Sequence, residues 1–114
     1  MPPKAFLGEF EQMVLLGIAK LGSDAYGPNI SRELESSAGR SVSRGALYTT
    51  FDRLRGKGLL DWSVETGDGD GGRTGLPKRL FSVSPAGVAA LRTSRNALLN
   101  LWHGLEDVLG ESPR

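Results

Sequence analysis

The apolar residues in the first half of the chain recur at the spacing of α-helices. The first run lies near helical periodicity and consists of Phe6, Phe10, Met13, Val14, Leu16, Ile18 and Leu21. It predicts a helix over about 9–21, because Gly22 is a typical C-terminal stop. A second, shorter run has an apolar residue every four positions, at Tyr26, Ile30 and Leu34. It predicts a second helix that ends near Gly39.

The third helical run has one apolar side and one polar side. Ser43 is a typical N-cap, and the residues that follow on the inward stripe are Leu47, Phe51 and Leu54. The opposite arc of the helical wheel carries Gly45, Thr49 and Asp52, flanked by Tyr48 and Arg53. The pattern therefore predicts a helix that buries one face, presents the other, and ends near residue 56 or 58.

Beyond this helix the period changes from helical to alternating. Leu60, Trp62 and Val64 alternate with polar residues and predict a half-buried strand over about 59–66, in which Trp62, like Tyr26 before it, is interpreted as a core residue. Five glycines within residues 67–75 predict a loop, and a second strand over about 78–83 closes a hairpin. Ser84 and Pro85 then begin a helix expected to continue to about residue 109.

This order of elements predicts a mainly α fold with a small β-hairpin. Three helices, a hairpin and a long helix are the pattern of a winged helix-turn-helix over residues 1–84, followed by a C-terminal helix and tail over 85–114, all in one structural unit. A chain of 114 residues with 39% hydrophobic and 24% charged residues suits a single globular domain. No export signal or membrane span is visible, and we expect a cytoplasmic protein.

The net charge of +1 conceals two basic clusters. Residues 40–57 contain Arg40, Arg44, Arg53, Arg55 and Lys57 against one acid, Asp52. A second cluster, Arg73, Lys78 and Arg79, lies on the glycine-rich hairpin. A solvated helix surface is the alternative interpretation of the first cluster, but two clusters on a helix and an adjacent hairpin favour a surface that binds double-stranded DNA.

The small residues Gly45 and Ala46 would let the start of the third helix enter a major groove, where side chains reach base edges or phosphates. The helix N-terminus also favours phosphate. The residues expected to contact DNA are Arg40, Ser43, Arg44, Gly45, Tyr48, Thr49, Arg53, Arg73, Lys78 and Arg79.

Several segments together resemble the PadR family of bacterial transcriptional regulators. They are Leu7–Leu16, Ala25–Gly27, Gly45–Leu54, Lys57–Leu60 and Ser84–Gly87, in the order and with the spacing of the family. The resemblance implies a winged helix-turn-helix homodimer that represses promoters at an inverted-repeat operator, without catalysis. It implies a phosphate contact for Tyr48, whereas the residues alone equally allow a half-buried ring beside Arg44 and Arg55. The insertion Thr74–Pro77 departs from the family, which lengthens the hairpin tip.

The resemblance also implies that the C-terminal helix is the dimer element, in the compact branch of the family that has a single such helix. The residues support this independently, because Leu91, Leu98 and Leu105 recur every seven positions in a stripe too broad for a monomer of this size to cover. The expected dimer interface comprises Phe6, Phe10, Leu91, Leu98, Leu101, Trp102, Leu105, Val108 and Leu109. Family members that bind aromatic ligands suggest a small aromatic inducer at this interface, near Trp102.

The residue types needed for other chemistry are missing. The sequence has no cysteine, and its one histidine, His103, has no partner for a metal site or a catalytic triad. The acidic loop at Asp68 and Asp70 lacks the later ligands of a calcium loop, since Gly72 and Arg79 stand at those positions. We therefore expect no enzyme, cofactor or metal; the alternative function is a winged helix that binds a protein partner instead of DNA.

Overall fold

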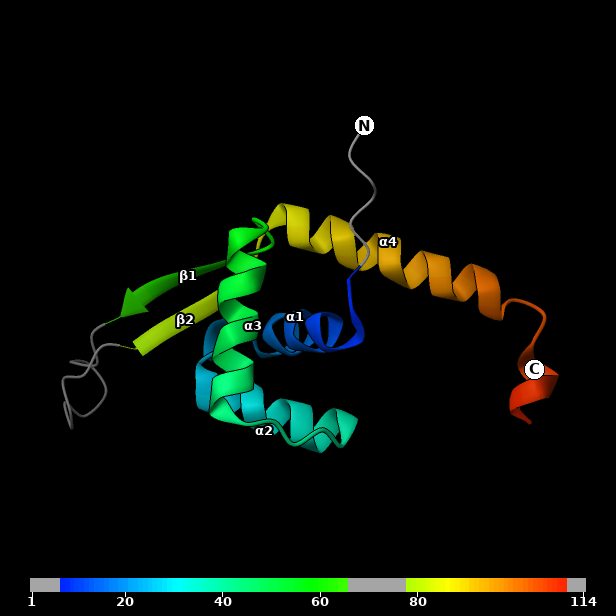
Figure 1. Cartoon of the computed structure of the whole chain (residues 1–114), viewed down its shortest axis with the longest axis horizontal. Helices are drawn as coiled ribbons and strands as arrows, with labels where there is room; N and C mark the ends of the chain where they lie inside the picture. The colour runs from blue at the N-terminus through cyan, green and yellow to red at the C-terminus, as the bar shows by residue number, and fades with distance from the viewer. Residues whose placement is uncertain (1–6, 66–77, 111–114) are drawn as a thin grey trace.

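The computed structural model describes residues 7–65 and 78–110 (Figure 1). Three helices form a central body, with a hairpin projecting from one side and the last long helix crossing above and extending beyond the other side. Across the described ranges, no helix has both the length and the apolar character to cross a membrane. The elements in chain order are α1 (Glu9–Leu21), η1 (Gly22–Asp24), α2 (Gly27–Ala38), α3 (Arg44–Gly56), β1 (Leu60–Glu65), β2 (Lys78–Val83), α4 (Pro85–Trp102) and η3 (Glu106–Leu109).

The helix boundaries follow from local capping chemistry. The Ser43 hydroxyl accepts a hydrogen bond from the Ala46 amide and begins α3, as the sequence predicts. The Ser84 hydroxyl begins α4 in the same way, by accepting from the Gly87 amide. α2 ends at Gly39, which adopts the left-handed conformation that glycine allows (φ 64°).

The core lies where α1, α2, α3 and the root of the hairpin meet. The inward stripe predicted for α3 is buried, and the Phe51 ring stacks on Phe81 of β2 with centroids 4.1 Å apart. The largest fully buried side chains are Phe51, Phe81, Leu15, Ile18, Ile30, Leu54, Leu60 and Val14. Each helix of the central body therefore contributes one apolar face to a single core.

The hairpin is an antiparallel pair in which Trp62 lies opposite Phe81 and Val64 lies opposite Arg79. A β-bridge joins Tyr26 to Leu80, and the Phe81 amide donates to the Ala25 carbonyl at 2.9 Å. These bonds attach β2 to the turn before α2. The predicted alternation holds only near the core: Leu60 is buried, Trp62 and Tyr26 are half-buried, and Val64 is exposed because the strands extend past the helices.

α4 and its cap join the body through three close contacts. A Cβ atom at Gly87 would lie 2.2 Å from the Leu59 carbonyl oxygen, so the first turn of α4 lies directly against the chain between α3 and β1. The Ser84 hydroxyl also donates to the Gly58 carbonyl at 2.7 Å. Further along, the buried Ser94 hydroxyl accepts from the Leu7 amide at 3.3 Å. The first half of α4 is therefore anchored to the body.

The expectation of one helix continuing to residue 109 is wrong. α4 ends at Trp102, and Gly104 adopts a positive φ of 85° before the separate 3-10 turn η3. An interior glycine lowers helix stability and readily adopts this conformation, so the chain turns away from the axis of α4 (Figure 1). Leu105, Val108 and Leu109 consequently do not continue the seven-residue stripe of Leu91 and Leu98.

Candidate nucleic-acid interface and apolar groove

The outer face of α3 has the composition predicted for it. Gly45, Thr49, Asp52 and Arg53 are exposed opposite the buried stripe that packs into the core, and Arg44 is exposed at the edge of this face. A Cβ atom at Gly45 would meet nothing within 4 Å, so the first turn presents an unobstructed surface. The arc of α3 opposite the core therefore presents Gly45, Thr49, Asp52 and Arg53. Arg44, nine residues before Arg53, lies on the side of the helix next to Tyr48.

Tyr48 lies at the edge of this face with its ring half-buried. The ring meets Phe51 edge-on with centroids 5.0 Å apart, and the Arg44 guanidinium lies over it at 5.5 Å. A Cβ atom at Gly27 would lie 2.4 Å from the Tyr48 hydroxyl oxygen, so Gly27 makes room for the ring against the start of α2. Arg44 is thus the neighbour of Tyr48 that the sequence predicts, whereas Arg55 lies over the Trp62 ring.

Arg40 and Ser43 lie beside α3 and already have intramolecular partners. One Arg40 nitrogen is 3.3 Å from the Glu9 carboxylate, and its guanidinium lies 5.3 Å from the centre of the Phe10 ring. The Ser43 hydroxyl is engaged as the cap of α3. Both residues precede α3 in the chain, but Glu9 partly neutralises the charge of Arg40.

The hairpin contributes Lys78 and Arg79, which are exposed on β2, while Arg73 lies outside the described residues. Lys78 lies 5.4 Å above the Tyr26 ring, whose hydroxyl donates to Glu65 at 2.7 Å. The Arg79 guanidinium lies 4.7 Å from the centre of the Trp62 ring.

A second guanidinium covers the same Trp62 ring. Arg55, from the last turn of α3, lies 4.0 Å from the ring centre. Arg55 belongs to the basic cluster recognised in the sequence but was not among the residues predicted to contact DNA. The signal that could have identified it is its position four residues after Phe51, which places it on the side of α3 toward the hairpin.

One ion pair connects α1 to the end of α3. The Lys57 ammonium donates to Glu11 at 2.8 Å, and the Gly8 amide donates to the other oxygen of the same carboxylate at 3.1 Å. Burial alone raises the pKa of Glu11, but the hydrogen bonds from Lys57 and Gly8 and the nearby positive charges outweigh it and hold the pKa below its usual value of 4.5.

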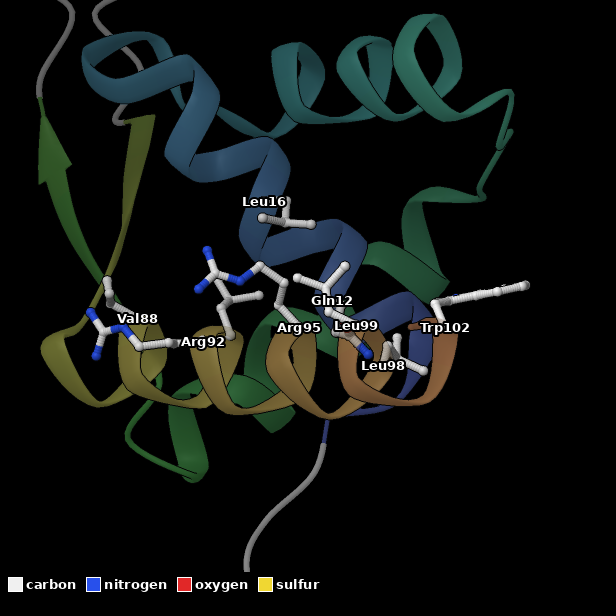
Figure 2. Close-up of a pocket in the computed structure, with 9 residues that line it drawn as sticks. Gln12, Leu16, Val88, Arg92, Arg95, Leu98, Leu99 and Trp102 are labelled. Carbon is white, nitrogen blue, oxygen red and sulfur yellow. The ribbon is translucent and has the colours of Figure 1, made fainter. Parts of the chain in front are cut away.

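An apolar groove of about 530 Å³ separates α1 from α4. Figure 2 shows Gln12 and Leu16 on one side and the side chains of α4 on the other, with Trp102 at one end. Leu98, Leu99 and Trp102 are exposed here although they are large and apolar. Arg92 and Arg95 contribute the charge on the α4 side of the groove.

The residues predicted for the dimer interface are distributed over several places. Leu98, Leu101 and Trp102 are exposed on the second half of α4, with Leu101 at 73%, while Leu91 and Phe10 are half-buried against the core. Leu105, Val108 and Leu109 are exposed after the end of the helix, and Phe6 lies outside the described residues.

Within residues 7–65 and 78–110, no group of three His, Cys, Asp or Glu side chains could hold a metal ion. His103 is exposed at the C-cap of α4. The acidic loop at Asp68 and Asp70 lies outside the described residues.

Three helices that carry an antiparallel hairpin, with a basic outer face on the third helix, define a winged helix-turn-helix. This chain belongs to the PadR-like family of transcriptional regulators, whose family model matches residues 15–93. The family consists of regulators and not of enzymes.

Similar proteins agree with this assignment. The chain is 36% identical over 88 residues to Transcriptional regulator Rv3488 of Mycobacterium tuberculosis, which covers 77% of this chain and 73% of that protein. A PadR-like regulator from Bacillus cereus has the same fold, with a TM-score of 0.66, 17% identity, and coverage of 90% and 93% of the two chains. A PadR family regulator from Eggerthella lenta gives a TM-score of 0.62 and 23% identity over 89% and 86%.

Proposed function

We propose that this regulator is a cytoplasmic repressor that binds an inverted-repeat operator as a homodimer. α3 enters the major groove, where Arg44, Thr49 and Arg53 reach base edges or phosphates, and the hairpin follows the backbone or minor groove. The observation that carries the proposal is the exposed surface of α3, where Thr49 and Arg53 lie opposite the core, Arg44 lies at the first turn, and a Cβ atom at Gly45 would meet nothing within 4 Å.

The dimer in this proposal forms through α4. In a monomer, the exposed side chains of Leu98, Leu99, Leu101 and Trp102 contribute no free energy of hydrophobic burial. A second copy of the same surface would cover them. The resemblance to PadR regulators implies a second copy of this chain as the occupant, in place of an unrelated protein. Two copies of α3 would then meet successive major grooves about 34 Å apart, which requires a two-fold symmetric site.

Repression in this proposal results from occupancy of a promoter. The test is selection of bound fragments from the source genome, followed by fluorescence anisotropy with the recovered site and with a scrambled duplex of equal length. Recovery of an inverted repeat that binds at least about 1,000-fold more tightly than the scrambled duplex supports the proposal. Equal binding to both duplexes contradicts sequence-specific regulation. Absence of binding to any duplex favours the alternative, a winged helix that binds a protein partner.

The groove beside Trp102 supports a second proposal, that a small aromatic inducer binds between the two copies of α4. The groove combines an apolar lining with an indole ring, a chemistry suited to planar aromatic molecules. Titration of planar aromatic compounds should quench Trp102 emission in a Trp62→Phe variant and, in a separate measurement on the parent protein, release the operator. Quenching without any change in operator affinity would contradict the inducer role.

A further inference from the structure

Three arginines of α3 and the hairpin lie against aromatic rings instead of carboxylates. Arg44 lies over Tyr48, and both Arg55 and Arg79 lie over Trp62. The ion pairs are elsewhere, at Lys20–Glu33, Arg40–Glu9 and Lys57–Glu11. In the part of the chain that the structure describes, no carboxylate lies within ion-pair distance of these three arginines.

The Trp62 ring is held in place by the core. It meets Phe81 edge-on with centroids 5.6 Å apart, and Phe81 is itself stacked on Phe51. Because Trp62 pairs with Phe81 and Val64 pairs with Arg79, Arg79 is the diagonal cross-strand neighbour of Trp62 on the same face of the hairpin. Arg55 reaches the ring from α3. One fixed ring thus orients arginines from two different elements.

An aromatic ring restrains an arginine without neutralising it. The guanidinium stacks through its flat face, so its N–H donors at the edge remain available for a planar or tetrahedral anion. Two guanidiniums close to one ring also repel each other, and an anion between or beside them relieves this repulsion. A carboxylate partner would restrain the arginines equally well but would cancel the charge that attracts DNA.

We propose that Trp62 is a positioning residue that holds Arg55 and Arg79 as a paired phosphate-binding site at the base of the hairpin. The inference rests on the proposed DNA binding and deepens it. It adds Arg55 to the DNA-binding surface and gives Trp62 a role that acts through the two arginines. The ligand is the DNA backbone, because phosphate accepts charge-assisted hydrogen bonds from guanidinium regardless of sequence.

The test measures affinity for a random-sequence duplex over a range of salt concentrations, so that it depends on no particular operator. Replacing both arginines, Arg55→Gln with Arg79→Gln, should lower affinity and reduce the magnitude of the slope of log K against log [salt] by about 0.9 for each phosphate that is no longer neutralised. Lys20→Gln, which removes a single charge from the end of α1, is the control for loss of charge away from the hairpin and should leave the slope nearly unchanged. An unchanged slope in the double variant would overturn the proposal.

A double-mutant cycle separates positioning from simple stabilisation of the fold. Trp62→Leu should weaken binding roughly three- to tenfold, by loss of two cation–π restraints, and Trp62→Tyr should restore most of it. In the Arg55→Gln, Arg79→Gln background, Trp62→Leu should change affinity less than about twofold. Equal losses in both backgrounds would show that the ring acts independently of the arginines, which contradicts the proposal.

A further double variant leaves the Trp62 ring in place. Arg55→Lys with Arg79→Lys keeps both charges but loses the flat, stacked guanidinium, and should weaken binding to random duplex by a factor similar to Trp62→Leu. Affinity equal to that of the parent would mean that charge alone matters and would overturn the positioning role. If the parent protein binds no duplex at all, the proposed function fails and not this inference alone.

Discussion

The α3–hairpin surface and the second half of α4 differ in how their side chains are held. On α3 and the hairpin, Arg44, Arg55 and Arg79 lie over Tyr48 or Trp62, and these rings contact the core through Phe51 and Phe81. On α4, the large side chains beyond Ser94 lie exposed around a groove. The first surface is organised before any partner arrives, whereas the second surface lacks the apolar layer that would cover it.

This difference matches two kinds of partner. A polyanion is attracted by unneutralised charge at fixed positions, so organising the cations in advance reduces the entropy lost on binding. An apolar surface gains free energy only when water is removed from it, so it needs a close complementary surface and not fixed charges. Substitutions on each surface test whether the two are this distinct.

The largest effect is expected from charges placed on the groove side of α4. Leu98→Asp with Leu99→Asp should give a monomer in sedimentation and weaken operator binding roughly 1,000-fold or more, because each half-site must then be bound separately. Both side chains are exposed in the monomer, so its fold should persist. The control is Asn96→Asp with Asn100→Asp, on another face of the same helix. A dimeric double variant at Leu98 and Leu99 would place the interface elsewhere.

The second-largest effect is expected where the first turn of α4 packs against Leu59. Gly87→Ala should lower the free energy of unfolding by about 3 kcal/mol, because its methyl group would overlap the Leu59 carbonyl. The matched substitution Gly45→Ala, in the open first turn of α3, should raise it by about 0.5 kcal/mol, because alanine restricts the unfolded chain more than glycine does. Urea denaturation measures both. Equal stability of the two variants would mean that the first turn of α4 is not tightly packed.

A smaller effect is expected from the base-reading residues of α3. Arg53→Ala and Thr49→Ala should each weaken operator binding by about 1–3 kcal/mol and random-duplex binding by less. Lys20→Ala, at the end of α1, is the control and should weaken binding to neither duplex. Competition anisotropy against both duplexes measures the ratio. Equal losses on operator and random DNA would assign these residues to the phosphate backbone.

The smallest effect concerns α1, which contacts both surfaces. Glu11→Gln keeps an oxygen for the Gly8 amide but loses the ion pair with Lys57, and should cost about 1 kcal/mol at pH 7. Because folding lowers the pKa of Glu11, its contribution is present above pH 4.5 and is lost as the pH falls through the lower folded value.

Urea midpoints at pH 7 and pH 3 measure this contribution. The parent should lose more stability between the two values than Glu11→Gln does. Glu9→Gln, whose side chain is 77% exposed, should change stability at pH 7 by less than about 0.5 kcal/mol. Identical pH dependence of the parent and Glu11→Gln would show that the pair contributes nothing.

The central body was predictable from the sequence because local signals and core packing agree. The caps Ser43 and Ser84 and the inward stripe of α3 all hold, as do the bounds of β2. The sequence did not predict the end of α4, because the seven-residue apolar repeat continues past Gly104, where the chain leaves the helix. The spacing of Arg55 from Phe51 places it on the hairpin side of α3, but its contact with Trp62 depends on how the helix and the hairpin are placed in space.

Only Ser84 separates the last residue of β2 from the first residue of α4. Ser84 also donates a hydrogen bond to Gly58, and Gly87 lies against Leu59. These contacts fix the direction of α4 relative to the body. In the proposed dimer, a small rotation of one α4 helix relative to the other would therefore move the whole body to which it is attached. The spacing of the two recognition helices would follow the crossing angle of the α4 pair, so a molecule that changed that angle would act on DNA without touching it.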